Sequence, residues 1–532
     1  MKYLALILAL SFSAGARATI TCANFKTVTA NGAPADQLKK FLDLEWKYSM
    51  VTYPEFATYV GYPGQNDRWT DRSLSAIAEQ HKMTECLHGV LKKINPKGLG
   101  ETDRLNYDLS LRNHELSVEG LKYPSEYLAI DQLGGVHMDI PDMLVGQVEA
   151  LLRAGHKKKL TAVKQFLQKV PGQFDTVLTE KGIDSPLYAP FKEINIAIPE
   201  IQKAAFRAKA LTTIESEIYP AYKKLKKFLV DEYIPAAREK IAWKDMPDGE
   251  NWYNFLINVH TTTRATSEEL HQLGLKEVAR IQNEMTKTKE LAGFKGDLKA
   301  FNKFLLEDSK FYYKTGEELL AGYRDIAKRL DSELPKIFGK LPRLPYGVRA
   351  IPDYKAAASP TAYYMGGSLE GGRAGYFEAN THDLKSRPKW GMEVLTMHEA
   401  VPGHHLQIAL SQEMEKLPEF RKHDSQTAYV EGWALYSESL GADLGMYKDV
   451  YSKYGQLTYE IMRAVRLVVD TGMHAKGWTR EQSLKFFMDA MPTTKLEAEV
   501  EIDRYITWPG QALAYKVGQL KIRELRTSAE KE

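Results

Sequence analysis

The sequence predicts a mainly α-helical protein, in which two helical lobes surround a cleft and a small antiparallel sheet lies beside a histidine-rich helix. Residues 36–245 are rich in Leu, Ala, Lys and Glu, with apolar residues at helical spacing. Residues 245–251 combine Asp, Pro, Gly and Asn, which is typical of a loop between structural units. After Pro342, short aromatic and β-branched segments bounded by Pro or Gly indicate strands.

The first 18 residues have the pattern of a secretory signal peptide. Lys2 precedes an apolar run that extends to about Phe12, and Ala16-Arg17-Ala18 matches an A-x-A cleavage site. The run is too short to span a membrane, and no later uncharged stretch approaches that length. We therefore expect cleavage near Ala18, export to the periplasm or out of the cell, and no transmembrane anchor.

The chain contains two cysteines, Cys22 and Cys86. In an oxidising compartment they can form a disulfide, and the alternative is two unpaired thiols. The sequence leaves both possibilities open. Lipid attachment at Cys22 has weak support, because the residue before it is Thr21 rather than Gly, Ala or Ser.

The mature chain is expected to form two lobes. Residues 19–245 form the N-terminal helical lobe, and residues 246–532 form the second lobe, which carries the chemistry discussed below. The formal net charge of the whole chain is +3, and two of its positive charges, Lys2 and Arg17, leave with the signal peptide. This near-neutral balance gives no reason to expect nucleic acid or an anionic membrane as a partner. It does not predict the oligomeric state.

One N-terminal segment illustrates the helical pattern, with apolar residues repeating on a single face: Ile214, Ile218, Leu225 and Phe228. In the second lobe, three segments are expected to be strands, because they are short, aromatic or β-branched and bounded by Pro or Gly. These segments are residues 346–351, 362–365 and 376–377. We expect them to form the small antiparallel sheet just before the histidine-rich helix.

Residues 398–405, with the sequence HEAVPGHH, concentrate three imidazoles and one carboxylate. In a regular helix, residues four apart can place two imidazoles on one ion, but His404 and His405 follow His398 by six and seven positions. Pro402 lacks an N–H and clashes with the carbonyl four residues back, and Gly403 tolerates unusual backbone angles. We therefore expect a helix break that returns His404 to the ligand position, with His405 as the alternative ligand.

A second carboxylate, Glu431, follows in the segment YVEGW. It lies off the apolar stripe of its expected helix, and the adjacent Gly432 permits close approach of another backbone. Two His and one Glu with an open fourth position form a catalytic zinc set. Glu399, beside the first His, can accept a proton from a metal-activated water. The sequence thus predicts one zinc ion and a general base, and the alternative is a structural or degenerate site.

The motif HEAVPGHHLQ resembles the signature of the bacterial DUF885 family, which groups with the gluzincin-type, thermolysin-like metallopeptidases. The similarity covers roughly residues 250 to 520 and continues more loosely toward the N-terminus. The resemblance implies that His398, His404 and Glu431 are the metal ligands. It also implies that a sheet edge beside the metal helix pairs with an extended substrate. Three further segments also resemble segments of the family: residues 270–279, 371–380 and 504–515.

The sequence departs from thermolysin-like enzymes at one position. Their Glu ligand is often followed, four residues later, by a carboxylate that orients a ligand His. Here that position is Leu435, and the nearest downstream substitute is Glu438. The sequence therefore leaves open which residue orients the ligands.

The C-terminal segment is expected to complete the site. Amide hydrolysis builds negative charge on the former carbonyl oxygen, and a phenol or guanidinium can stabilise it. We assign Tyr515 to this stabilisation and Arg504 to substrate anchoring, because a guanidinium can bind both carboxylate oxygens. The alternative is packing by aromatic residues and a surface Arg. Further substrate-binding candidates are Tyr505, Arg373, Tyr376 and Asn380, while His382, His137 and Gln132 are weaker candidates to face the cleft.

The function most consistent with these features is a zinc-dependent peptidase that hydrolyses short peptides, with Glu399 as general base. A zinc hydrolase of another amide, such as a cell-wall fragment or an acylated amino acid, would use the same site, because both substrates present a carbonyl to the metal. A non-catalytic peptide-binding envelope protein is the third possibility, although it would not need a general base. The sequence does not separate endo- from exo-cleavage.

Overall fold

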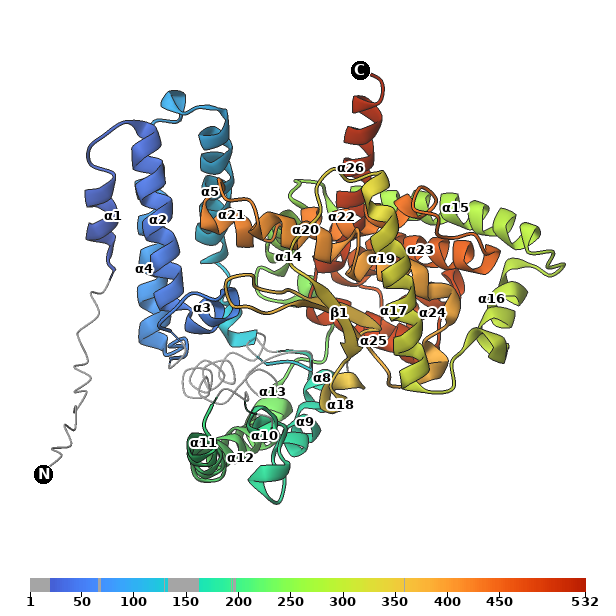
Figure 1. Ribbon diagram of the computed structural model, residues 1–532, viewed down its shortest axis with the longest axis horizontal. Coiled ribbons are helices and arrows are strands. Elements are labelled where there is room, and N and C mark those ends of the chain that lie inside the picture. Colours follow the sequence, from blue (N-terminus) through green and yellow to red (C-terminus); the bar gives the residue numbers. More distant parts are fainter. Residues whose placement is uncertain are drawn as a thin grey trace, which may run out of the picture.

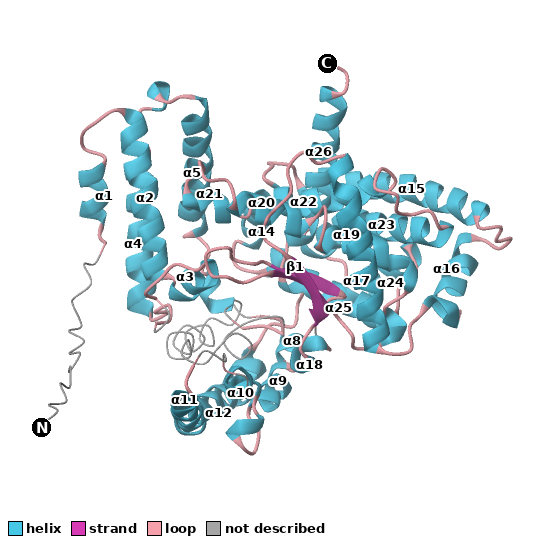
Figure 2. Ribbon diagram, viewed as in Figure 1, coloured by secondary structure: helices cyan, strands magenta, loops and turns pink. Residues whose placement is uncertain are grey.

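The computed structural model describes residues 20–532 except 66–67, 129, 133–161, 193, 195–197 and 358. Helices dominate these residues, and one three-stranded sheet accompanies them (Figure 1 and Figure 2). The mainly α class predicted from the sequence is therefore confirmed. The predicted signal peptide lies outside the described residues.

The N-terminal helices form a group of their own at one side of the molecule, coloured blue to cyan in Figure 1. Apolar residues of these helices, among them Phe25, Phe41 and Tyr107, form a shared core. Cys22 at the start of the first helix and Cys86 in the fourth form a disulfide, so the paired alternative holds. The helices are α1 (Cys22–Val28), α2 (Pro34–Thr52), α3 (Pro54–Val60), α4 (Leu74–Leu91) and α5 (Glu101–Gly120).

A second helical group follows, seen at the bottom of Figure 1. The helical face predicted there is observed: Ile214, Leu225 and Phe228 are buried. A π-helical turn, Ile214–Ile218, joins two of its helices. The helices are α8 (Lys164–Leu167), α9 (Val170–Val177), α10 (Ala189–Lys192), α11 (Glu200–Thr213), α12 (Tyr219–Phe228) and α13 (Ile234–Ala236).

The core of this second group continues past the predicted lobe boundary at residue 245. Trp243 on one side of the boundary packs in the same hydrophobic cluster as Trp252 and Leu467 on the other side. The division into residues 19–245 and 246–532 therefore stays a prediction.

The rest of the chain is built around α23 (Val450–His474), whose residues are mostly buried. α15 (Ser267–Leu291) packs along it, and α19 (Met392–Glu399) and α25 (Lys495–Thr507) also contact it. The remaining helices are α14 (Gly249–Thr261), α16 (Leu298–Glu307), α17 (Gly316–Glu333), α18 (Asp353–Ala356), α20 (His404–Gln412), α21 (Glu419–His423), α22 (Thr427–Glu438), α24 (Arg480–Ala490) and α26 (Ala514–Ala529).

The small sheet lies where the sequence predicts it, but it is mixed rather than antiparallel. Its strands are β1 (Tyr346–Ala350), β2 (Ala362–Met365) and β3 (Gly375–Ala379), in the order β1-β3-β2. β2 pairs antiparallel with β3, the next strand in the chain, whereas β1 pairs parallel with β3. The correction arises because β3 inserts between the first two strands, an order that local sequence patterns do not encode.

The sheet packs against the helices that carry the histidine motif. Phe377 of β3 shares a hydrophobic cluster with Tyr323 of α17, Leu395 of α19 and Leu406 of α20. The edge strand β2 contacts α19. Within the described part of the chain, none of the helices has the length and apolarity needed to cross a membrane.

Candidate metal centre

The histidine motif folds as two helices separated by a turn, as the sequence predicts. α19 ends at Glu399 and α20 begins at His404, with Pro402 and Gly403 between them. A Cβ at Gly403 would lie 2.0 Å from the carbonyl oxygen of His398, so only glycine permits this close approach. Trp433 of α22 donates its indole N–H to the carbonyl of Pro402 and fixes the turn.

His398, His404 and Glu431 converge on one point. The ligand atoms of these three residues lie within 4.8 Å of one another. Glu431 Oε2 is 3.6 Å from His398 Nε2 and 3.4 Å from His404 Nε2. These distances are long for hydrogen bonds, and Glu431 Oε2 is buried without a hydrogen-bond partner among the described residues. Two imidazole nitrogens and one carboxylate oxygen that face one another in this way fit a zinc ion.

The electrostatics of the centre favour a positive charge at the same point. Burial lowers the pKa of His398, but the carboxylates of Glu431 and Glu438 outweigh it and raise this pKa to about 9. Burial raises the pKa of Glu431, but the facing imidazoles of His404 and His398 outweigh it and hold this pKa well below its usual value. The Glu431 carboxylate is therefore ionised at neutral pH, as a metal ligand must be.

Glu438 resolves the question that the sequence left open. Its Oε1 lies 2.7 Å from His398 Nδ1, and its side chain is fully buried. Glu438 follows Glu431 by two helical turns, so both carboxylates project from the same face of α22. A carboxylate on the far nitrogen of a ligand His fixes its tautomer and ring orientation. By contrast, His404 Nδ1 is buried and has no partner among the described residues.

His405, the alternative ligand, turns away from this centre. Its Nδ1 lies 2.9 Å from the hydroxyl of Tyr364 on β2, and its ring packs against Tyr346 on β1 with a centroid distance of 4.6 Å. Burial lowers the pKa of His405 to about 4, so the imidazole is neutral. His405 thus connects α20 to the sheet, and His404 is the second imidazole of the cluster.

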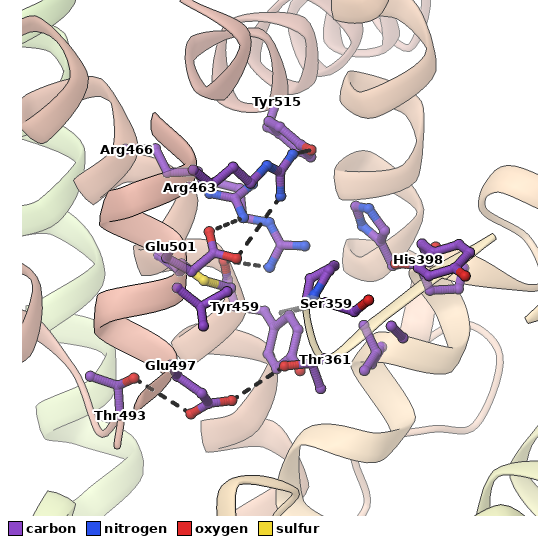
Figure 3. A pocket seen from close by; sticks show the side chains of 18 of the residues that line it. Ser359, Thr361, His398, Tyr459, Arg463, Arg466, Thr493, Glu497, Glu501 and Tyr515 are labelled. Carbon is purple, nitrogen blue, oxygen red and sulfur yellow. Dashed lines mark hydrogen bonds and ion pairs between the residues drawn. The ribbon is translucent and has the colours of Figure 1, made fainter. Parts of the chain in front are cut away.

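A cavity of about 590 Å³ opens onto the cluster. His398, Glu399, His404 and Glu431 line it, and the Glu399 side chain makes no hydrogen bond or ion pair with the described residues. The wall also includes residues 359–364, which lead into and form β2. Figure 3 shows His398 at one side of this cavity, facing side chains of α23, α25 and α26. Glu399 is therefore open to a bound molecule, next to the cluster.

Tyr515 reaches the cluster because two helices touch at glycines. A Cβ at Gly432 of α22 would lie 2.5 Å from Gly518 Cα of α26, so the backbones approach closely. This contact, which the sequence suggested for Gly432, brings the ring of Tyr515 to 6.3 Å from that of His398, nearly parallel to it. Arg504 also lines the cavity and donates to the hydroxyl of Tyr515 at 2.9 Å.

Comparison with known proteins agrees with the family part of the resemblance noted in the sequence. The family described as "Bacterial protein of unknown function (DUF885)" matches residues 143–532, well over half of the chain. The chain belongs to the DUF885 family. No curated protein matches it.

Two solved structures are similar to this DUF885 chain along most of its length. One, described as a putative lipoprotein from Colwellia psychrerythraea, is 26% identical with a TM-score of 0.84, over 94% of this chain and 93% of the other. The second, described as a putative lipoprotein of unknown function from Shewanella oneidensis, is 17% identical with a TM-score of 0.65, over 94% of each chain. The second likeness concerns the fold alone.

Four predicted substrate-binding residues of the DUF885 chain lie outside the described cavity lining. Arg373 donates to the carbonyls of Gly366 and Tyr59 and so ties the β2–β3 connection to α3. Tyr376 stacks under the guanidinium of Arg349. Both residues lie in the segment 371–380 and make contacts within the protein. A sequence pattern alone does not distinguish such contacts from contacts with a substrate.

The other two of these residues support the cavity from behind. Asn380 donates to the carbonyls of Ala356, Ser359 and Pro360, and so shapes the loop that forms part of the wall. Tyr505 is buried, and its hydroxyl accepts from Arg466 and donates to Glu501. Of the weaker candidates, Gln132 and His382 line the cavity, and His137 lies outside the described residues.

Two arginines of α23 that line the cavity, Arg463 and Arg466, were not predicted from the sequence. Both are buried on α23, a helix whose residues are mostly buried. Charged side chains are rarely buried without a partner, so two arginines within the run IMRAVRLVV were a usable signal. Helical spacing alone did not indicate that this face of α23 lines a cavity.

Proposed function

We propose that this protein is an exported zinc-dependent peptidase that hydrolyses short peptides. The observation that carries the proposal is the convergence of His398, His404 and Glu431 on the wall of a cavity that Glu399 also lines. Two His and one Glu leave a fourth position for substrate or water, which distinguishes a catalytic from a structural zinc site. The relationship to thermolysin-like gluzincins belongs to this proposal and rests on the HEAVPGHH motif.

His398, His404 and Glu431 would hold the zinc ion, and Glu438 would keep the His398 ring in its ligand orientation. When bound, the ion supplies a Lewis acid beside the carbonyl of the amide. Glu399 removes a proton from the attacking water, whose oxygen then bonds to the carbonyl carbon. The same carboxyl group returns the proton to the nitrogen as the carbon–nitrogen bond breaks, so that an acid and an amine are released.

Tyr515 is suited to stabilise the negative charge that forms on the carbonyl oxygen. Its hydroxyl accepts hydrogen bonds from Arg504 Nη2 at 2.9 Å and from Gln511 Nε2 at 3.2 Å. A phenol that accepts from two donors still has its own proton to donate. We assign the oxyanion contact to Tyr515.

The edge strand β2 is suited to hold the peptide backbone. β2 pairs with β3 on one side only, and Ala362, Tyr363 and Tyr364 line the cavity. An extended peptide can add to such an edge through backbone hydrogen bonds, with little dependence on its side chains. The cavity volume of about 590 Å³ suits short peptides and excludes folded proteins.

Export is supported by the leader and by the disulfide. Disulfides persist in oxidising compartments, and Cys22 and Cys86 are paired. The two similar structures are described as putative lipoproteins. In this chain the sulfur of Cys22 is bonded to Cys86, so it is not free to carry a lipid. We propose a signal peptide cleaved near Ala18 and a periplasmic or secreted protein.

The test is digestion of a mixed peptide library by the purified mature protein, with the products identified by mass spectrometry. We expect zinc-dependent cleavage that a chelator abolishes and that zinc restores. Zinc binding without cleavage of any peptide, but with hydrolysis of cell-wall fragments or acylated amino acids, would move the function to another amide. Zinc binding without turnover of any amide would leave a binding protein.

A further inference from the structure

Three arginines line one part of the cavity wall, close to the metal cluster. Arg463 and Arg466 project from α23 and Arg504 from α25, and the first two are less than 5% exposed. Figure 3 shows Arg463 and Arg466 grouped with Tyr515 and Glu501, apart from Glu497 and Thr493 lower in the view. Burying three guanidinium groups is costly unless anions or other acceptors compensate them.

The described residues compensate these charges only in part. Glu501 pairs with Arg466 at 2.8 Å and lies 3.9 Å from Arg504. Arg463 lies 3.6 Å from Glu438, a carboxylate that already binds His398, and donates to the carbonyl of Tyr459.

Each of the three arginines also keeps a buried N–H without a hydrogen-bond partner among the described residues. These atoms are Arg463 Nε, Arg466 Nη1 and Arg504 Nε. Another cavity arginine, Arg387, differs, because it bonds the carbonyls of Asn380 and Ser386 and pairs with Glu497. We call Arg463, Arg466 and Arg504 the arginine wall. Its positive charge is only partly compensated, and an anionic ligand group in the cavity would compensate it further.

The ring of Tyr515 lies near both the arginines and the metal cluster. The ring of Tyr515 lies 4.4 Å from the Arg466 guanidinium carbon and 5.8 Å from that of Arg463. The same ring stacks on that of His398 with a centroid distance of 6.3 Å. Arg463 lies closer, because its Nη2 is 3.6 Å from Glu438 Oε1, which is 2.7 Å from His398 Nδ1. One extended residue spans roughly 3.5 Å, so a peptide group at the cluster is one or two residues from Arg463.

We propose that these arginines bind a free carboxylate of the substrate, and that the enzyme is a carboxypeptidase that removes one or two residues from the C-terminus. This inference rests on the proposed peptidase function and names its substrate class. A planar guanidinium binds both oxygens of a carboxylate. An amide or an ester does not offer two negatively charged oxygens and cannot make this contact. Every linear peptide offers such a group at its C-terminus, whereas an acidic side chain near the cleaved bond occurs only in some peptides.

Arg463 is the central residue of the proposed carboxylate-binding site, which we call the anchor. Its guanidinium has the weakest commitments to the protein, since its nearest carboxylate is at 3.6 Å and is shared with His398. The other two arginines supply further positive charge from fixed positions. Glu501 and Tyr505 hold Arg466, and Gln511 and Tyr515 hold Arg504.

The experiment measures peptide binding to the zinc-loaded Glu399→Gln protein, which keeps its ligands but lacks the general base. The probes are N-acetyl-tetra-alanine with a free C-terminus, its C-terminal amide, and an amide that ends in Glu. We expect the free acid to bind about 10- to 100-fold more tightly than the alanine amide, as for a lost charged hydrogen bond. Preference for the Glu amide over the free acid would overturn the assignment to the C-terminal carboxylate.

Arginine variants identify the anchor. Arg463→Gln in the Glu399→Gln background should remove most of the difference between acid and amide, and Arg463→Lys should restore part of it. Lys495→Ala removes an exposed cation from the same helix as Arg504 and should leave the difference unchanged. If Arg463→Gln does not fold, the binding of the free acid and of the alanine amide to the Glu399→Gln protein is the test. Equal binding of these two peptides overturns the proposal.

The same peptides separate this inference from the proposed function. If the wild-type protein cleaves the free acid and the amide equally well, the peptidase stands and the carboxylate anchor fails. If the free acid binds more tightly but neither peptide is cleaved, the anchor stands and the peptidase fails.

Discussion

Glu399 separates catalysis from metal binding at the scale of single residues. It lies beside His398 but is not one of the converging ligands, and it lines the cavity. Glu399→Gln should therefore retain zinc near the wild-type content and lose activity by about 10²–10⁴-fold or more, because proton transfer is lost. Metal analysis and peptide turnover on the same preparation test this. Substantial activity in the variant would rule out the mechanism.

The two adjacent imidazoles give a matched pair of variants. His404 faces Glu431, whereas His405 binds Tyr364 and packs on Tyr346. His404→Ala should lose the metal, and His405→Ala should keep it while losing some stability through the missing sheet contact. Zinc titration of both variants decides between the ligands. Metal loss from His405→Ala alone would reverse the assignment.

Tyr515 and Arg504 should affect different kinetic constants. Tyr515→Phe removes the phenolic proton that acts only on the developing charge, so kcat should fall with little change in KM. Arg504→Ala removes positive charge from the substrate anchor, so its main effect should be a higher KM. Steady-state kinetics on a free-acid peptide tests both, and a KM effect of the Tyr variant without a kcat effect would contradict the oxyanion role.

At the scale of elements, sequence reasoning succeeds where the physics is local. Pro402 and Gly403 predict the break between α19 and α20 because both act on the backbone within one turn. The strand positions also follow from local patterns, whereas the parallel pairing of β1 with β3 depends on which strand inserts between the others. Whether Tyr376 faces the cavity depends on the same non-local order.

The contact between α22 and α26 controls where Tyr515 lies. An added methyl at Gly432 would meet Gly518 Cα at 2.5 Å, so Gly432→Ala should force the helices apart. We expect a loss of roughly 1–3 kcal/mol in the free energy of unfolding, and a lower kcat as Tyr515 shifts. Gly89→Ala on α4 is the matched control, because a Cβ there meets nothing within 4 Å. Thermal melting and kinetics of both variants test the contact.

At the scale of the whole molecule, the candidate site is assembled from distant segments. The metal ligands come from residues 398–431, which the sequence identified, whereas Arg463 and Arg466 come from a buried helix and Gln132 from the N-terminal half. The packing of α23 against α19 and α25 sets the position of the two arginines. Such packing leaves only a weak trace in one sequence, here two charges within an apolar run.

Asp470 couples this packing to pH. It lies on α23, fully buried, accepts from the hydroxyl of Tyr253 on α14 at 2.6 Å, and accepts from the N–H of Gly510 before α26. Burial raises the pKa of Asp470 to about 7, against an ordinary value of 3.8. The folded state thus holds the proton more tightly than the unfolded state does.

The sign of the pH effect follows from this difference. The contribution of Asp470 to stability is complete below about pH 4 and is lost as the pH rises through 7. Asp470→Asn keeps an oxygen acceptor for Tyr253 and Gly510 but cannot ionise, so its thermal midpoint should decrease less between pH 5 and pH 8. Burial raises the pKa values of Glu460 and Glu501, but the paired cations outweigh it and lower both to about 2, so neither group titrates in this window. If the thermal midpoints of the wild-type protein and the variant decrease equally, Asp470 is ionised over the whole range from pH 5 to pH 8, with Tyr253 and Gly510 stabilising the charge.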